Sequence, residues 1–75
     1  MIFLIEYDRE QGKVVKLSRF LETEREVANS ARLSLELELN QLAIEHEVVL
    51  LEAEDESALR RTHRRYFEDL LELAS

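Results

Sequence analysis

The 75-residue sequence contains no cysteine, no proline and a single glycine. Without cysteine the chain forms neither a disulfide nor a thiolate metal site. A single glycine excludes a glycine-rich phosphate-binding loop, which needs several. No apolar stretch approaches the roughly 18 residues of a membrane helix, so we expect no membrane partner.

Acidic residues outnumber basic ones, with 17 Asp and Glu against 10 Lys and Arg, and the net charge is −7. This balance favours solubility and opposes non-specific attraction to nucleic acids and anionic membranes. The first residues, MIFLIEYDRE, lack the basic region and the small-residue cleavage site of a secretory signal. We therefore expect an acidic, cytoplasmic protein of bacterial type.

Residues 1–75 make one domain, with no linker, internal repeat or low-complexity tract. A domain of this size buries only about 60% of the surface that its unfolded chain exposes. Natural chains this small usually gain stability from disulfides, a metal or a partner subunit. Since disulfides are excluded, the sequence predicts a homo-oligomer.

Three segments have the pattern of β-strands. Residues 1–7, MIFLIEY, are apolar at odd and even positions, which is typical of a strand in the middle of a sheet. A polar turn at 8–12 with Gly12 leads to a second strand at 13–20, where interspersed Lys and Arg indicate a sheet edge. Residues 46–53, HEVVLLEA, form the third strand, again apolar on both faces.

The sequence TERE at 23–26 fits a capping box, and a helix should run from there to about residue 44. The alternation of leucine in LSLELEL, 33–39, would instead suit a strand. We favour the helix because no glycine or proline interrupts residues 21–45 and because helical spacing explains the apolar positions on both sides. One arc of about 120° holds its main apolar stripe: Val27, Ala28, Ala31, Leu35, Leu39 and Leu42.

A final helix follows Asp55 or Ser57, either of which can cap it. One face of this helix is predicted to pack inward. That face consists of Leu59, Thr62, Tyr66, Leu70 and Leu73, widened by Phe67 and Ala74.

These elements predict an α+β fold of order β-β-α-β-α, with a three-stranded sheet of order 2-1-3 and both helices on one face. A right-handed crossover makes the third strand parallel to the second. The other sheet face then stays apolar, and a second stripe of the long helix, made of Leu33, Leu37 and Ile44, lies opposite the main one. A helix of about 33 Å should also overhang strands of about 23 Å. We expect a homodimer that buries the second sheet face or this stripe.

The stretch VVLLEAEDESALRRTHRRYF, 48–67, resembles the strand-then-helix unit of short ferredoxin-like bacterial proteins of unknown function. Those proteins carry a histidine near the middle of the helix and include a nickel-responsive group. The chain begins with a hairpin where a full ferredoxin-like domain begins β-α-β. The resemblance therefore implies a half-size ferredoxin-like unit that completes itself as a dimer, with His63 as the candidate metal ligand.

Four arginines gather in LRRTHRRYF, residues 59–67. Acidic residues four positions away would neutralise them as a solvent face, through the pairs Glu56–Arg60, Arg64–Glu68 and Arg65–Asp69. Two other roles stay open. The arginines could contact phosphate, above all through Arg61 and Arg64, or an acidic surface on a partner subunit. The cluster consists of Arg60, Arg61, Arg64 and Arg65, and the acidic surface of Glu36, Glu38, Glu45 and Glu47.

The residues themselves predict no metal site, no cofactor and no catalytic group. Positions four before and after His63 are Leu59 and Phe67, so this histidine lacks a local co-ligand. Strand alternation sends the glutamates beside His46 to the opposite face. A hydroxyl paired with His63 would lack an orienting carboxylate.

The sequence therefore predicts a small non-enzymatic interaction or regulatory module that acts as a homodimer. The first alternative is an antitoxin-like, nucleic-acid-binding accessory protein that uses the arginine cluster. The second is a small-ligand or metal-responsive protein centred on His63.

Overall fold

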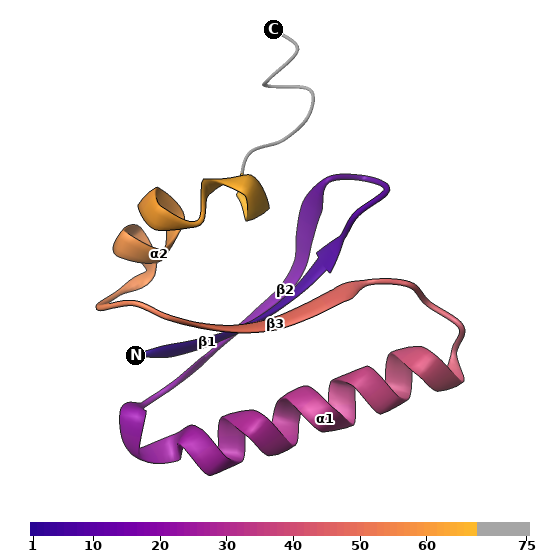
Figure 1. The fold of residues 1–75 in the computed structure, drawn as a ribbon, viewed down its shortest axis with the longest axis horizontal. Helices are drawn as coiled ribbons and strands as arrows, with labels where there is room; N and C mark the ends of the chain where they lie inside the picture. The colour runs from indigo at the N-terminus through magenta and orange to yellow at the C-terminus, as the bar shows by residue number, and fades with distance from the viewer. Residues whose placement is uncertain (68–75) are drawn as a thin grey trace, which may run out of the picture.

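Strand β1 (Ile2–Asp8) is the centre of a three-stranded sheet in the computed structural model, which describes residues 1–67 (Figure 1). Strands β2 (Lys13–Phe20) and β3 (Glu47–Glu52) flank it, both antiparallel to it. The predicted α+β fold and sheet order 2-1-3 are confirmed, and β3 runs parallel to β2 as the crossover requires. The remaining elements are the helices α1 (Arg25–Gln41) and α2 (Glu56–Thr62) and the 3-10 turns η1 (Glu22–Glu24) and η2 (Arg64–Tyr66).

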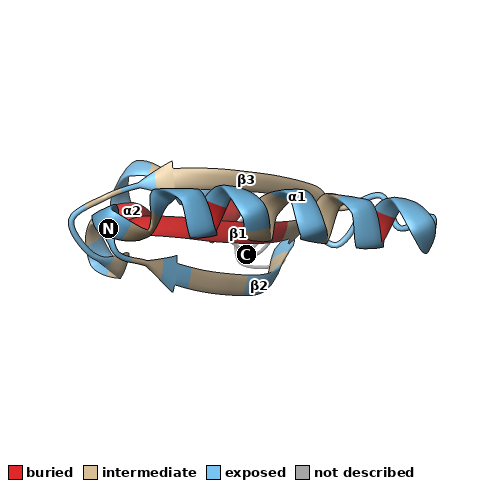
Figure 2. Cartoon of the chain, turned by 90° about the horizontal axis from the view of Figure 1, so that it is seen from below, coloured by how far each residue is buried: buried red, intermediate tan, exposed pale blue. Residues whose placement is uncertain are grey.

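The two helices cover opposite faces of the sheet, whereas the sequence analysis placed both on one face (Figure 1). Seen from below, α1 lies across the middle of the sheet and α2 lies behind it (Figure 2). The physical reason is that β1 is apolar on both faces, so each face needs a cover. Because α2 covers the second sheet face, that face is not an open dimer interface of the kind expected from the sequence.

The core on the α2 side consists of Phe3, Ile5 and Leu59, each fully buried. On the α1 side, Ile2 and Leu4 of β1 are buried beneath the helix. Burying one such side chain contributes about 1.5–3 kcal/mol. The central strand therefore contributes to both layers of a very small core.

A β-bulge at Val15 decides which side chains of β2 reach the core. Glu6 pairs with Lys16 while the next residue, Tyr7, pairs with Val14, so Val15 has no partner in the ladder. The extra residue turns Val14 toward the Phe3 and Ile5 side and leaves Val15 half exposed. Bulges of this kind are typical of edge strands, which agrees with the edge position predicted for β2.

Helix α1 begins later than predicted, because η1 occupies residues 22–24. The predicted capping box on Thr23 and Glu26 is wrong. The carboxylate of Glu24 instead accepts a hydrogen bond from the Leu21 backbone N–H at 2.8 Å, and the Glu24 N–H donates to the Leu21 carbonyl at 2.9 Å. These two bonds close η1 where the chain leaves β2, and α1 itself begins after Glu24 without a side-chain cap.

The C-terminal end of α1 is a Schellman motif closed by an alanine. Ile44 N–H donates to the Leu39 carbonyl at 2.9 Å, and Ala43 N–H donates to the Asn40 carbonyl at 3.2 Å. Ala43 has φ 56°, the left-handed conformation that glycine usually supplies at this position. Figure 2 shows this end of α1 extending past the strands, as its length predicted.

The sheet-facing side of α1 is centred on Ala28 and Leu39, both buried, with Ala31 and Leu35 beside them. Val27 and Leu42, predicted for the same stripe, are 55% and 60% exposed. Val27 lies at one margin of the predicted arc, whereas Leu42 is the C-cap residue just beyond the end of α1. The helix is rotated so that the opposite margin, near Arg32 and Glu36, is half-buried instead.

Helix α2 is much shorter than its apolar spacing predicted. It ends at Thr62, and His63 at φ −122°, ψ 52° separates it from η2. Leu59 and Tyr66 are buried as predicted, but Thr62 is exposed and its hydroxyl donates to the Ala58 carbonyl at 2.9 Å. The predicted inward positions Leu70, Leu73 and Ala74 lie outside the described residues.

Replacing Ala43 by glycine should stabilise the protein. A left-handed non-glycine residue costs roughly 1–2 kcal/mol, and the greater freedom of glycine in the unfolded chain offsets part of the gain. We expect Ala43→Gly to raise the free energy of unfolding by about 0.5–1 kcal/mol in urea denaturation. Ser34→Gly, at an exposed position inside α1, is the control and should lower it by about 0.5 kcal/mol. A loss of stability in Ala43→Gly would contradict the role given to this motif.

Candidate functional site

The arginine cluster is held by a short, well-capped helix. The Asp55 carboxylate accepts a hydrogen bond from the Ala58 backbone N–H at 2.7 Å, which confirms Asp55 as the cap of α2. Leu59 then anchors the helix in the core. This orientation leaves Arg60, Arg61, Arg64 and Arg65 exposed.

Arg60 is engaged within the chain. Its guanidinium donates to the Glu56 carboxylate at 3.1 Å, the predicted pair four residues apart, and lies 4.6 Å from the centre of the Phe67 ring. The same carboxylate also accepts from Arg19 of β2, at 3.1 Å. Glu56 thus joins α2 to the edge strand.

Arg65 is engaged with β3. It donates to the Glu47 carboxylate at 2.9 Å and lies 4.6 Å from the centre of the Tyr66 ring. The predicted partner Asp69 lies outside the described residues. Glu47 had been assigned to an acidic surface for a partner subunit, and Glu36 of that surface pairs with Arg32 at 3.2 Å. Half of the proposed acidic surface is therefore paired inside the chain.

Arg61 and Arg64 line a hollow of about 410 Å³ together with Ser57 and Arg60. The side chain of Arg61 makes no hydrogen bond or ion pair with any of residues 1–67. The partner predicted for Arg64, Glu68, lies outside the described residues. The structure thus brings three of the four arginines to one hollow, while Arg65 contacts β3.

His63 is the C-cap residue of α2, and it belongs to no group of metal-binding side chains within residues 1–67. Its backbone N–H donates to the Leu59 carbonyl at 2.9 Å, and the residue is half-buried. Within residues 1–67 no three His, Asp or Glu side chains are grouped so as to hold a metal ion.

The second histidine forms a buried polar contact that the sequence analysis missed. His46 Nδ1 lies 2.6 Å from Glu6 Oε2, and its Nε2 lies 3.6 Å from Asp8 Oδ2. Glu6 is the buried charged residue of the described chain, at 8% exposure. The contact follows from the pairing of Tyr7 with Glu47, which places His46 beside the even-numbered side chains of β1. Predicting this contact requires the register of β1 against β3, which the sequence alone does not give.

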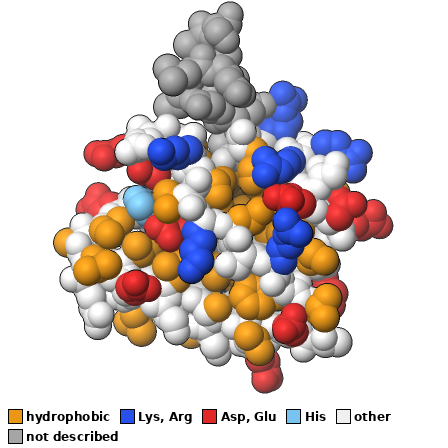
Figure 3. Space-filling model, turned by 180° about the vertical axis from the view of Figure 1, so that it is seen from behind, with side chains coloured by type: hydrophobic (Ala, Val, Ile, Leu, Met, Phe, Trp, Pro, Cys, Tyr) orange, Lys and Arg blue, Asp and Glu red, His pale blue; other side chains and the backbone are white. Residues whose placement is uncertain are grey.

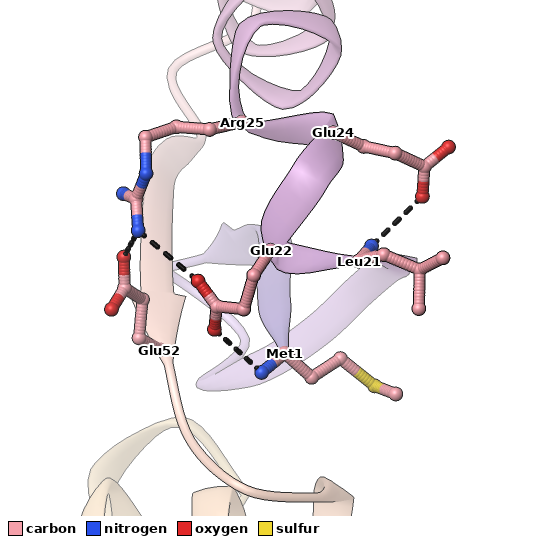
Figure 4. Close-up of polar contacts among 6 residues, drawn as sticks. All are labelled: Met1, Leu21, Glu22, Glu24, Arg25 and Glu52. Carbon is pink, nitrogen blue, oxygen red and sulfur yellow. Dashed lines mark hydrogen bonds and ion pairs between the residues drawn. The ribbon is translucent and has the colours of Figure 1, made fainter.

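A polar network ties the start of β1 to the start of α1 (Figure 4). The Met1 ammonium donates to the Glu22 carboxylate at 2.8 Å, and Arg25 donates to the same carboxylate at 3.2 Å while also pairing with Glu52 of β3. The ammonium hydrogen bond, aided by Arg25, lowers the pKa of Glu22 below its ordinary value of 4.5. The hydrogen bond from Arg25 to Glu52, and then the charge of Glu52, raise the pKa of Arg25.

The side of α1 that faces away from the sheet is solvent-exposed along the helix (Figure 2) and carries exposed leucines. Leu33 is 52% exposed, Leu37 62% and Ile44 39%. Leu33 and Leu37 lie opposite the sheet-facing stripe, as predicted. Ile44 does not, because it follows the end of α1 and lines a hollow with Leu39 and Val48 on the sheet side. We call the surface around Leu33 and Leu37 the outer face of α1, and it also includes the exposed polar residues Glu26, Asn29, Ser30, Asn40 and Gln41.

The chain matches no family model, no curated protein and no solved structure. Among residues 1–67, no helix has the length and apolar character needed to cross a membrane.

The lowered pKa of Glu22 gives its carboxylate a defined pH dependence. The unfolded chain binds a proton at this group more readily than the folded chain does. The stabilisation is therefore present above the ordinary value of 4.5 and is lost as the pH falls through the folded-state pKa. In an NMR titration of the Glu22 carboxyl carbon we expect a midpoint below 4.5.

Acetylating the Met1 amino group removes the first cause of this shift and should raise the Glu22 midpoint. Arg25→Met should raise it by a smaller amount, because Arg25 is the lesser cause. Identical midpoints with the free and the acetylated amino group would contradict the network.

Proposed function

We propose that this protein is a small non-enzymatic interaction module that acts as a homodimer through the outer face of α1. The observation that carries the proposal is the exposure of Leu33 and Leu37 on a helix whose opposite side already packs on the sheet. A helix with two apolar sides must pack both of them to bury them, and within residues 1–67 the sheet packs against one side only. Exposed apolar patches of this kind mark protein–protein contacts.

The composition of the outer face supports the same role. Charged residues make up 36% of the chain, yet the exposed neighbours one turn from Leu33 and Leu37 on this side include the uncharged Asn29, Ser30 and Asn40, and the charged Glu26 lies at the N-terminal end of the face. Depletion of charge at the centre of a surface is what distinguishes interface cores from ordinary protein surface.

A second copy of the chain fits this surface better than an unrelated partner of high charge. A two-fold axis brings the same patch of each subunit together, so an uncharged patch meets an uncharged patch. Ser30 and the leucines provide small and large side chains that interdigitate when two helices pack 8–10 Å apart. The 17 residues of α1, about 26 Å long, give a continuous contact line.

Nucleic-acid binding has less support from the arrangement of the arginines. Arg60 and Arg65 already pair with Glu56 and Glu47 of the same chain. Such pairs neutralise part of the positive potential that phosphate contact requires. The Arg61 side chain makes no hydrogen bond or ion pair with residues 1–67, so its guanidinium donors stay available.

The dimer proposal is tested by placing a charge at its centre. Leu37→Glu would leave two carboxylates close together in an apolar contact, so dissociation should become at least tenfold easier, equivalent to about 1.4 kcal/mol. Sedimentation velocity across micromolar concentrations measures this change. The melting temperature of the unaltered protein should also rise with concentration, as for any coupled dimer.

Val15→Glu is the matched control. Val15 is 48% exposed on β2, away from the outer face of α1, and the substitution adds the same charge. We expect this variant to dimerise as the original chain does. A monomer at all concentrations, or equal weakening by both substitutions, would overturn the proposal.

A further inference from the structure

A hollow of about 350 Å³ lies where the β1–β2 hairpin meets the segment after α2. Its lining comes from Lys13, Val14 and Leu17 of β2, from Arg60 of α2, and from Tyr66 and Phe67, with Gly12 at the hairpin turn. The volume falls at the lower end of the range typical of small-molecule sites. Figure 3 views the molecule from the β2 side, where exposed apolar side chains adjoin several Lys and Arg side chains.

The apolar part of the lining is fixed by the core. Val14, Leu17 and Phe67 all pack against the buried cluster of Phe3, Ile5 and Leu59. Tyr66 is 7% exposed, and its ring meets the Tyr7 ring edge to face with centres 5.1 Å apart. The hollow therefore exists in the folded chain without rearrangement, which lowers the free-energy cost of binding a ligand.

Every polar side chain of the lining can donate a hydrogen bond, and each is either positively charged or neutral. They belong to Lys13, Arg60 and Tyr66, and no carboxylate of residues 1–67 lines the hollow. The charge of the lining is therefore positive, although the chain as a whole has a net charge of −7.

Both cations retain donors for a ligand. The side chain of Lys13 forms no hydrogen bond or ion pair with residues 1–67. Arg60 uses one nitrogen for Glu56, a carboxylate that it shares with Arg19, and a guanidinium has five N–H donors. The guanidinium also lies over the Phe67 ring, 4.6 Å from its centre, which fixes it at the rim of the apolar surface.

We propose that this hollow binds a small apolar carboxylate, with its aliphatic or aromatic body on the apolar lining and its carboxylate accepting hydrogen bonds from Lys13 and Arg60. A neutral apolar molecule would leave these donors without an acceptor, and a cation would be repelled by them. The site lies on the sheet face opposite α1. Ligand binding and the proposed dimerisation are therefore independent of each other.

The test compares three probes that share one ring system: 2-naphthoate, 2-naphthalenemethanol and 2-naphthylmethylammonium. Isothermal calorimetry should give 2-naphthoate a Kd below about 1 mM. It should bind about fivefold more tightly than the alcohol, with the ammonium weakest. Amide NMR shifts on adding 2-naphthoate should centre on Gly12, Val14 and Phe67.

Lys13→Met should weaken 2-naphthoate about fivefold and leave the alcohol unchanged, because it removes charge and keeps an unbranched side chain. Lys16→Met is the control, since Lys16 is exposed on the same strand but pairs opposite Glu6, on the α1 side. It should change neither affinity. Equal binding of carboxylate and alcohol, shifts centred on the outer face of α1, or no saturable binding would each overturn the proposal. Repeating the titration on Leu37→Glu separates a failure of this site from a failure of the dimer.

Discussion

The burial of β1 on both of its faces is the constraint on which the rest of this fold depends. The four consecutive residues 2–5 are each at most 5% exposed, and β1 takes part in both backbone ladders of the sheet. A strand that is apolar on both sides must be covered twice. In 75 residues this leaves one helix for each face, and every other feature of the molecule follows from that division.

The two helices cover β1 in different ways. As a result, the outer face of α1 and the hollow beside β2 lie on opposite sides of the sheet. Helix α1 is long, and one side of it is enough to cover the sheet, so its other side presents Leu33 and Leu37 to solvent. Helix α2 is short and buries Leu59, after which the chain breaks at His63 and brings Tyr66 and Phe67 onto the sheet. That break forms the aromatic lining of the hollow beside β2.

Polar contacts between distant elements hold this arrangement in register. Arg65 reaches Glu47, Arg19 reaches Glu56, and Arg25 joins Glu22 to Glu52. Exposed ion pairs of this kind contribute little each, about 0–1 kcal/mol. Their effect on function is larger, because one of them engages Arg65, a member of the cluster that the sequence presents as a binding site.

The sequence by itself determined the element order, the central place of β1, the edge character of β2 and the two-sided apolar pattern of α1. Each is a local or periodic property, and local spacing is enough to predict it. The tertiary structure alone decided which face each helix covers, where α2 ends, and that His46 lies against Glu6. Those outcomes depend on contacts between residues far apart in the chain, such as Tyr66 on Tyr7. Helical spacing predicted that α2 would continue past His63, but burial of Tyr66 and Phe67 against the sheet was the stronger interaction.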